Sequence, residues 1–272
     1  MIGFANSKIN LGLNVLARRS DGYHDISTCF YPVGWNDILE IVPLSKGKTY
    51  LKTSGLEIPP GKDENLCLKA YRLVRKDFDI PEVGIHLHKQ IPSGSGLGGG
   101  SSDGSRMLLM LNTMFNVFLD EEMLAWYALK LGSDCPFFIY NTPALAGGRG
   151  EQFEEINIDL SGRHIVLVNP GFAISTQEAY RNLTPAIPDV PIREILEKKP
   201  VEEWKDILAN DFEEFAFKKF PVLEDIKNKL YNAGALYASM TGSGSGMYGI
   251  FENSPLQMPD FPSGYIIWSG TF

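Results

Sequence analysis

Residues Ile91-Pro-Ser-Gly-Ser-Gly-Leu-Gly-Gly-Gly-Ser-Ser-Asp103 form the most informative stretch of this chain. Glycine adopts positive φ angles without strain and lets a ligand approach the backbone closely. The start of the helix that is expected to follow supplies unpaired N–H groups and a partial positive charge. This combination is typical of a loop that holds a phosphate group.

The residues on either side of the stretch indicate ordered structure. Apolar residues recur at steps of three and four after Asp103, which predicts an amphipathic helix with Ser101, Ser102 and Asp103 as competent N-caps. A strand is expected before the loop, over Gly84–Lys89. The expected buried face of the helix consists of Met107, Leu108, Leu111, Met114, Phe115 and Phe118.

Other interpretations of the glycine-rich stretch fit less well. No Gly-Lys-Ser/Thr closes the loop, so it is not a Walker A motif, and no suitable acidic residue follows at the distance that a Rossmann fold requires. A flexible Gly/Ser linker is the structural alternative. The apolar strand and amphipathic helix that flank the stretch argue against a linker.

Composition limits the classes of protein that fit. The chain has 272 residues, of which 44% are hydrophobic and 21% charged, so we expect a globular protein with a sizeable core. Its net charge of −8 disfavours nucleic acid and anionic membranes as partners and favours a small anionic ligand. The three cysteines indicate neither a disulfide framework nor a zinc site. With no targeting segment in evidence, we expect a cytoplasmic protein.

The order of the expected elements favours an α+β fold over a doubly wound parallel sheet, because helices interrupt the strands without regular βαβ repetition. Turns are expected at Ser20–Gly22 and Gly34–Asp37, and a helix is expected to begin at Asn65. A change in composition near Gly147–Gly150 suggests two domains, 1–155 and 156–272. The other expected strands are Met1–Phe4, Ile9–Leu16, Ile26–Val33, Ile38–Val42, His164–Val168, Tyr237–Met240, Met247–Glu252 and Tyr265–Ser269, and the other helices begin near Asp120–Met123 or cover Ile192–Glu197, Glu202–Phe217 and Leu223–Ala233.

Three further clusters are candidates for completing a site with the glycine loop. Lys8 and Asn10 share one face of an expected strand, although a solvated lysine is the structural alternative. Asp134 lies on a turn between Gly132 and Pro136, where an aspartate also serves as a turn-former or cap. Met240–Met247 is a second glycine-rich loop, longer than a tight hairpin connection needs.

These motifs, in this order, resemble the GHMP kinase superfamily of small-molecule kinases. The resemblance rests on Ser7–Leu13, Asp21–Asp25, Pro92–Ser102, Gly132–Phe138 and Thr241–Gly246 and extends over essentially the whole chain. It implies an α+β two-domain GHMP kinase fold, with an N-terminal ATP-binding domain of the ribosomal S5 domain 2-like type and a ferredoxin-like C-terminal domain. Gly-Leu-Gly-Gly-Gly-Ser-Ser and Gly-Tyr-His resemble the branch that phosphorylates a cytidine diphosphate sugar alcohol for isoprenoid precursor biosynthesis.

The resemblance also implies roles for individual residues, with ATP and Mg²⁺ as cofactors and metal ligands unknown. Asp134 matches the family aspartate that takes the hydroxyl proton, and Lys8 matches the lysine beside it. The expected ATP-binding residues are Asn65, Lys89, Pro92, Gly94, Gly96, Leu97, Gly98, Gly99, Gly100, Ser101 and Ser102. The expected substrate-binding residues are Asn10, Tyr23, His24, Asp134, Thr176, Tyr180 and Gly242.

Departures from the family pattern and rival functions stay open at this level. Asp103 replaces a frequent Asn and adds negative charge beside the expected phosphate, unless it caps the helix and faces away. Ser7, Ser133 and Cys135 are smaller departures. The rivals are a homoserine- or mevalonate-type kinase and a non-enzymatic nucleotide sensor. The expected partner is the small-molecule substrate alone, bound by a monomer or weak homodimer.

Overall fold

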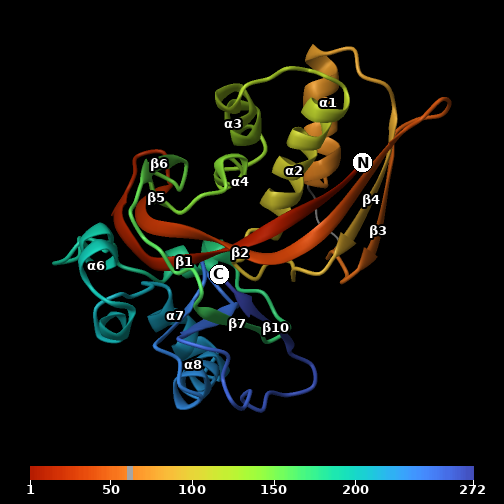
Figure 1. Ribbon diagram of the computed structural model, residues 1–272. Helices are drawn as coiled ribbons and strands as arrows, with labels where there is room; N and C mark the ends of the chain where they lie inside the picture. Colours follow the sequence, from red (N-terminus) through yellow and green to blue (C-terminus); the bar gives the residue numbers. More distant parts are fainter. Residues whose placement is uncertain (60–63) are drawn as a thin grey trace. The chain divides into compact units, whose positions relative to one another are not determined.

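A computed structural model describes residues 1–59 and 64–272, which form two compact units (Figure 1). Unit 1 comprises Met1–Ser7, Trp35–Ser93 and Gly98–Thr142, and unit 2 comprises Lys8–Gly34, Gly94–Leu97 and Pro143–Phe272. The chain alternates between the units because strands β1 (Ile2–Arg18) and β2 (His24–Pro43) each contribute residues to both. The proposed domain boundary at residue 155 stays a prediction.

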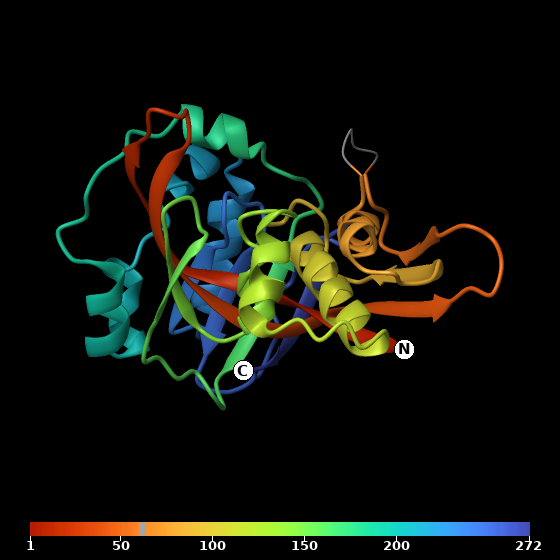
Figure 2. The same ribbon diagram turned by 90° about the horizontal axis from the view of Figure 1, so that it is seen from above.

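In unit 1, the second half of β2 pairs antiparallel with β4 (Val83–Lys89), which pairs in parallel with β3 (Tyr50–Gly55). Its helices are α1 (Leu66–Asp77), α2 (Gly99–Met114), α3 (Glu121–Leu129) and α4 (Phe137–Tyr140). Helices α1 and α2 lie side by side in both views (Figures 1 and 2). The expected mixture of strands and helices is confirmed.

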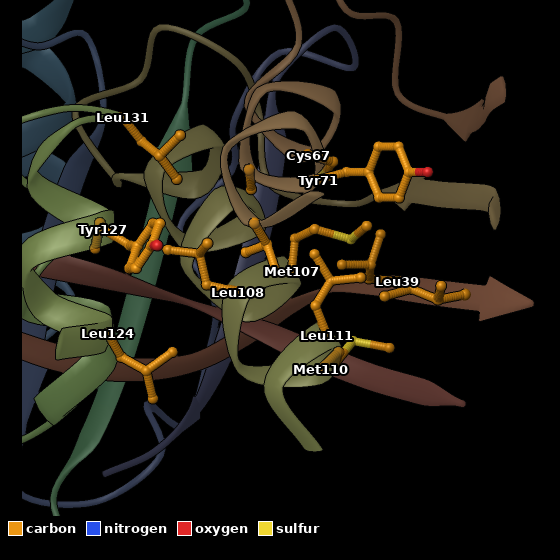
Figure 3. Close-up of a cluster of buried hydrophobic side chains, with 14 of the residues drawn as sticks. Leu39, Cys67, Tyr71, Met107, Leu108, Met110, Leu111, Leu124, Tyr127 and Leu131 are labelled. Carbon is orange, nitrogen blue, oxygen red and sulfur yellow. The ribbon is translucent and has the colours of Figure 1, made fainter. Parts of the chain in front are cut away.

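The core of unit 1 lies between the sheet and these helices (Figure 3). Ile85 and Leu87 of β4 alternate with His86 and His88, which contact Ser54 on the opposite face of the sheet. Lys89 has the same parity as Ile85 and Leu87, so the pleat directs this lysine to the core side. Figure 3 labels core side chains from β2, α1, α2, α3 and the residue pair after α3: Leu39, Cys67, Tyr71, Met107, Leu108, Met110, Leu111, Leu124, Tyr127 and Leu131.

Unit 2 contains a four-stranded antiparallel sheet in the order β10-β7-β9-β8. The first half of β2 pairs with β5, and β5 pairs with β6. The strands are β5 (Ala144–Gly147), β6 (Gln152–Glu155), β7 (His164–Asn169), β8 (Tyr237–Met240), β9 (Met247–Phe251) and β10 (Ile266–Thr271). The helices are α5 (Thr176–Arg181), α6 (Ile192–Lys198), the 3₁₀ helix η1 (Val201–Asp206), α7 (Glu213–Lys219) and α8 (Val222–Asn232). None of the helices in the described ranges combines the length and apolar character needed to cross a membrane.

The turn predicted at Gly34–Asp37 is wrong, because β2 continues through these residues. Trp35 and Asp37 are buried there, and Asp37 is fully engaged by neighbouring backbone and side-chain groups. Burial therefore overrides the turn preference of Gly, Asn and Asp. The two strands predicted before Ser20–Gly22 are likewise one continuous strand, β1.

Two helix predictions also needed correction. The helix expected over Glu202–Phe217 is interrupted, since Leu13 N–H donates to Ala209 O and Asp211 N–H donates to Leu13 O. Pairing with β1 thus takes up backbone groups that a helix needs. The predicted burial of Phe118 is wrong as well: α2 ends at Met114, and Phe118 is 85% exposed with φ of 61°.

The end of β4 remote from the glycine loop carries a hydrogen-bonded carboxylate. The Thr49 hydroxyl and backbone N–H donate to Glu82, and Arg75 pairs with it. These contacts lower the pKa of Glu82 from its usual 4.5 to about 2. The ionised form of Glu82 is therefore favoured in the folded protein.

We expect Glu82→Gln to reduce Tm at pH 7 by an amount that shrinks as the pH falls. A carboxyl with a lowered folded-state pKa stabilises the fold fully above about pH 4.5 and loses this effect between about pH 4.5 and 2. Thermal melts of both proteins across this range measure the difference. A Tm difference independent of pH would contradict the assignment.

Candidate active site

The glycine loop connects β4 to α2 and depends on glycine at three positions. Gly94, Gly96 and Gly98 have φ angles of 68°, 78° and 73°, which side chains other than glycine rarely adopt. Gly98 is the N-cap of α2 and provides no side-chain cap. The prediction of Ser101, Ser102 and Asp103 as N-caps is therefore wrong, since all three lie inside the first turns of the helix.

Space at the start of α2 suits a ligand that approaches the backbone. A Cβ atom added to Gly100 would meet no atom within 4 Å, whereas one added to Gly99 would lie 2.9 Å from Ile91 Cγ2. Gly99 is thus needed for packing, and Gly100 borders open space. The first N–H groups of a helix attract anions, so the backbone here fits a phosphate group.

Asp134 lies on a turn that hydrogen bonds fix to α2. Ser105 Oγ, on α2, lies 2.7 Å from Cys135 O and 3.0 Å from Ser101 O. Asp134 is half-buried, and burial raises the pKa of its neighbour Cys135 to about 12, so that thiol stays protonated near neutral pH.

Lys8, in unit 2, is buried in a polar and aromatic setting. Its Nζ atom donates to Asn10 Oδ1 at 2.6 Å and lies 4.7 Å from the centroid of the Phe30 ring. Its backbone N–H donates to Leu97 O, which ties β1 to the glycine loop. The alternative of a solvated surface lysine is excluded, since only 3% of Lys8 is exposed.

Asn10 connects Lys8 to the second glycine-rich loop. Besides the Lys8 ammonium, Asn10 Oδ1 accepts from Gly242 N–H at 2.9 Å and lies 3.1 Å from Thr241 Oγ1. Asn10 Nδ2 donates to Thr28 Oγ1 at 2.9 Å. The side chain of Asn10 therefore holds other site residues in place, and its predicted contact with substrate stays a prediction.

The second glycine-rich loop, Thr241–Gly246, connects β8 to β9 and contacts the first. Gly246 N–H donates to Ser95 O at 3.0 Å, and a Cβ atom on Gly96 would lie 2.0 Å from Thr241 O. Thr176 Oγ1, predicted to bind substrate, lies 2.9 Å from Ser243 Oγ of the same loop. Within unit 2 the structure thus brings together Lys8, Asn10, Gly94, Gly96, Leu97, Thr176 and Gly242 around the two loops.

The aromatic residues predicted to clamp a base are also in unit 2. The rings of His24 and Tyr180 are stacked with centroids 4.7 Å apart and an interplanar angle of 18°. Tyr23 is 57% exposed, and the guanidinium carbon of Arg149 lies 4.8 Å from its ring centroid. A base does not fit between rings at 4.7 Å, so stacking on that face of Tyr180 requires His24 to move.

Asn65 and Lys89, predicted to line an adenine pocket, both have structural contacts within the protein. Asn65 Oδ1 accepts from Cys67 N–H and so caps α1. Lys89 is buried, and its ammonium pairs with Asp37 and Asp103. Contacts of Asn65 and Lys89 with a nucleotide stay predictions. Three other predicted ATP-binding residues, Pro92, Leu97 and Ser102, have buried side chains, which leaves their backbone for such contacts.

Asp37 and Asp103 are residues that sequence reasoning missed or interpreted differently. Burial raises the pKa of Asp103 well above its usual range, opposed by the Lys89 charge. Burial also acts to lower the pKa of Lys89, but Asp103 and Asp37 together raise it. Asp103 therefore faces Lys89 in the interior and does not present an uncompensated charge to a phosphate.

Among residues 1–59 and 64–272, no three His, Cys, Asp or Glu side chains are grouped as a metal site.

Comparisons with known proteins agree with this arrangement. The family description "GHMP kinases N terminal domain" matches residues 65–142, and "GHMP kinases C terminal" matches residues 192–257. A protein of Bacteroides fragilis named 4-diphosphocytidyl-2-C-methyl-D-erythritol kinase is 49% identical over 93% of this chain and 92% of its own length. The protein of the same name from Cytophaga hutchinsonii is 47% identical over 94% of both chains.

Solved structures give the same result. A crystal structure of 4-(cytidine 5'-diphospho)-2C-methyl-D-erythritol kinase superposes with a TM-score of 0.81 at 33% identity and covers 100% of this chain and 98% of that chain. Mevalonate kinase of Methanococcus jannaschii, at 17% identity and a TM-score of 0.69 over 92% of this chain and 90% of its own, shares the fold.

The fold and the two glycine loops define a GHMP kinase, a class of small-molecule kinases that use ATP as phosphate donor. The α+β two-domain fold expected from the sequence is thereby confirmed. Within this class, the chain belongs to the 4-diphosphocytidyl-2-C-methyl-D-erythritol kinase family.

We expect Asn10→Ala to lower kcat about tenfold to hundredfold, because the Lys8 ammonium loses an acceptor and the Gly242 N–H loses its partner. Asn14→Ala is the matched control, since Asn14 lies on the same strand and donates to Asp211. ADP release measures kcat, and thermal melts confirm folding. Equal effects of the two substitutions would contradict the role given to Asn10.

Proposed function

We propose that this chain transfers the γ-phosphoryl group of ATP to the 2-hydroxyl of 4-diphosphocytidyl-2-C-methyl-D-erythritol in non-mevalonate isoprenoid precursor biosynthesis. Family membership at 44–50% identity over most of the chain supports the substrate. The observation that carries the proposal is the glycine loop, which leads into a helix start bordered by open space at Gly100.

The phosphates of ATP lie on the backbone of Gly94–Ser102 in this proposal. The first N–H groups of α2 donate to phosphate oxygens, and the helix dipole adds to the attraction. Because phosphoryl transfer through a loose transition state depends mainly on alignment and charge neutralisation, a rigid backbone cradle suits the reaction.

Asp134 and Lys8 are the proposed catalytic residues. Asp134 accepts the proton of the attacking hydroxyl, late in the transfer, and positions that hydroxyl. Lys8 stabilises negative charge that develops on oxygen, an effect strengthened by its burial from water. The hydrogen bond from Lys8 to Asn10 supports this role because it fixes the ammonium in one place.

Mg²⁺ is proposed as the second cofactor, held mainly by phosphate oxygens. Ser101 is the better protein ligand of the two candidates, because it is half-buried whereas Ser102 is 2% exposed. Oxygen ligands are those that Mg²⁺ prefers. When bound, the ion would neutralise negative charge on the phosphates of ATP.

Substrate choice is proposed to come from Tyr23, His24 and Tyr180. Stacking on an aromatic ring contributes about 1–3 kcal/mol per base, which is too little for strict base choice by itself. Polar contacts of His24 with the cytosine edge would supply the discrimination, once His24 moves from the ring of Tyr180.

The partners, the cellular compartment and the oligomeric state of the protein are also part of the proposal. A net charge of −8 supports a small-molecule substrate and disfavours nucleic acid and anionic membranes as partners. The cytoplasm is the proposed compartment. A monomer or weak homodimer remains the proposed oligomeric state.

We expect activity with the cytidylyl substrate and not with homoserine or mevalonate. A coupled ADP-release assay over these three alcohols, with ATP and Mg²⁺, measures kcat/KM for each. Preference for homoserine or mevalonate would identify another GHMP kinase, and ATP binding without turnover of any alcohol would identify a nucleotide sensor.

We expect Asp134→Ala to lower kcat about 10²-fold or more, the usual range for loss of a positioned proton acceptor. The dissociation constant for ATP should stay within about twofold, because no phosphate contact is removed. Asp120→Ala, which removes the N-cap of α3, is the matched aspartate control. Normal turnover by the Asp134 variant would remove Asp134 from the mechanism.

A further inference from the structure

Three ionisable side chains meet in the interior of unit 1. Asp37 on β2, Lys89 at the end of β4 and Asp103 on α2 are 0%, 3% and 3% exposed. Lys89 Nζ donates to Asp103 Oδ2 at 2.8 Å and also to Asp37 Oδ2. This cluster, the Asp37–Lys89–Asp103 triad, joins three elements through one ammonium group.

Asp37 also accepts hydrogen bonds from the backbone where the glycine loop begins. Its Oδ1 atom accepts from Gln90 N–H at 2.6 Å and from Ile91 N–H at 2.9 Å. A Cβ atom on Gly99 would lie 3.4 Å from Asp37 Oδ2, so this carboxylate also adjoins the first residue of α2. Asp37 thus hydrogen-bonds the backbone before the loop and lies close to the residue after it.

Burying these ionisable groups costs desolvation free energy, which indicates that the triad does more than stabilise the fold. Taking charges out of water costs several kcal/mol per ion, and well-packed apolar residues often replace a buried ion pair without loss of stability. Apolar replacements, however, would leave the N–H groups of Gln90 and Ile91 without their acceptor. The triad therefore fixes the loop in a way that apolar packing does not.

We propose that Asp37 is a positioning residue for ATP, and that it acts with Lys89 and Asp103 to keep both ends of the glycine loop in the nucleotide-binding conformation. This inference rests on the proposed use of the loop for ATP, but not on which alcohol is phosphorylated. Affinity falls in proportion to the population of the binding-competent conformation, so loosening the loop weakens ATP binding.

A carboxylate satisfies the site and an amide does not. Both oxygens of Asp37 accept, one from the loop backbone and one from the Lys89 ammonium. An amide in either orientation directs its NH₂ group at one of these donors. Asp37→Asn therefore breaks one set of contacts with almost no change in volume.

The test measures dissociation constants by calorimetry for the full chain with a non-hydrolysable ATP analogue and, separately, with the cytidylyl alcohol. We expect Asp37→Asn to raise the dissociation constant for the ATP analogue about tenfold, equivalent to a loop that is competent about one-tenth of the time. Affinity for the alcohol should stay within about twofold.

Glu82→Gln is the matched control, because it removes a hydrogen-bonded carboxylate at the other end of β4. It should lower Tm without changing ATP affinity. A folded Asp37→Asn variant with ATP affinity no weaker than that of Glu82→Gln would overturn the proposal.

Hydrogen exchange of the wild-type protein provides a second measurement, which does not depend on a variant that folds. We expect the Gln90 and Ile91 amides to be protected before any nucleotide is added. Exchange at the rate of an unprotected loop would overturn the proposal. If the protein binds the ATP analogue but does not phosphorylate the cytidylyl alcohol when ATP itself is supplied, that result would contradict only the proposed substrate.

Discussion

The contact of the Lys89 ammonium with Asp37 and Asp103 is the interaction on which the glycine loop depends. The loop itself has few side chains, so its conformation has to be set by residues that flank it. Asp37 accepts from the backbone at the loop entrance, and Lys89 reaches α2 through Asp103. The helix start proposed to bind phosphate is therefore held by polar groups that are buried from solvent.

A second polar centre, Asn10, has the same function in unit 2. Its amide oxygen faces the Lys8 ammonium and the N–H of Gly242, and its NH₂ group donates to Thr28. The lysine proposed to be catalytic and the second glycine loop are thus fixed by one buried side chain. In each unit, a buried polar side chain, Asp37 or Asn10, fixes a glycine loop through hydrogen bonds to its backbone or to the residues beside it.

Much of the fold was predictable because local signals and burial agree. Asn65 caps α1, Asp120 caps α3, and β8 has the expected bounds, since capping residues and alternating apolar residues act locally. The turn predicted at Gly34–Asp37 failed because burial of Trp35 and Asp37 is decided by distant parts of the chain. The interruption before α7 depends in the same way on pairing with β1.

The glycine content of the sequence identified the two glycine loops. It did not identify the residues that fix their conformation. Lys89 alternates in step with Ile85 and Leu87, and Asp37 in step with Leu39 and Ile41, so period-two alternation is the signal that could have placed both on the core side. Their pairing across 52 residues depends on strand register, which no local pattern specifies. The stacking of His24 on Tyr180 depends likewise on tertiary structure.

The interleaved course of the chain has a consequence for its synthesis. All segments of unit 1 have been made once residue 142 has left the ribosome, whereas unit 2 needs residues 8–34 together with the final 130 residues, 143–272. Since domains fold as units during translation, the segment that carries Lys8 has to wait for most of its partners. No single cut of the polypeptide yields two fragments that each contain one whole unit, so this enzyme cannot be divided into two independently expressed modules.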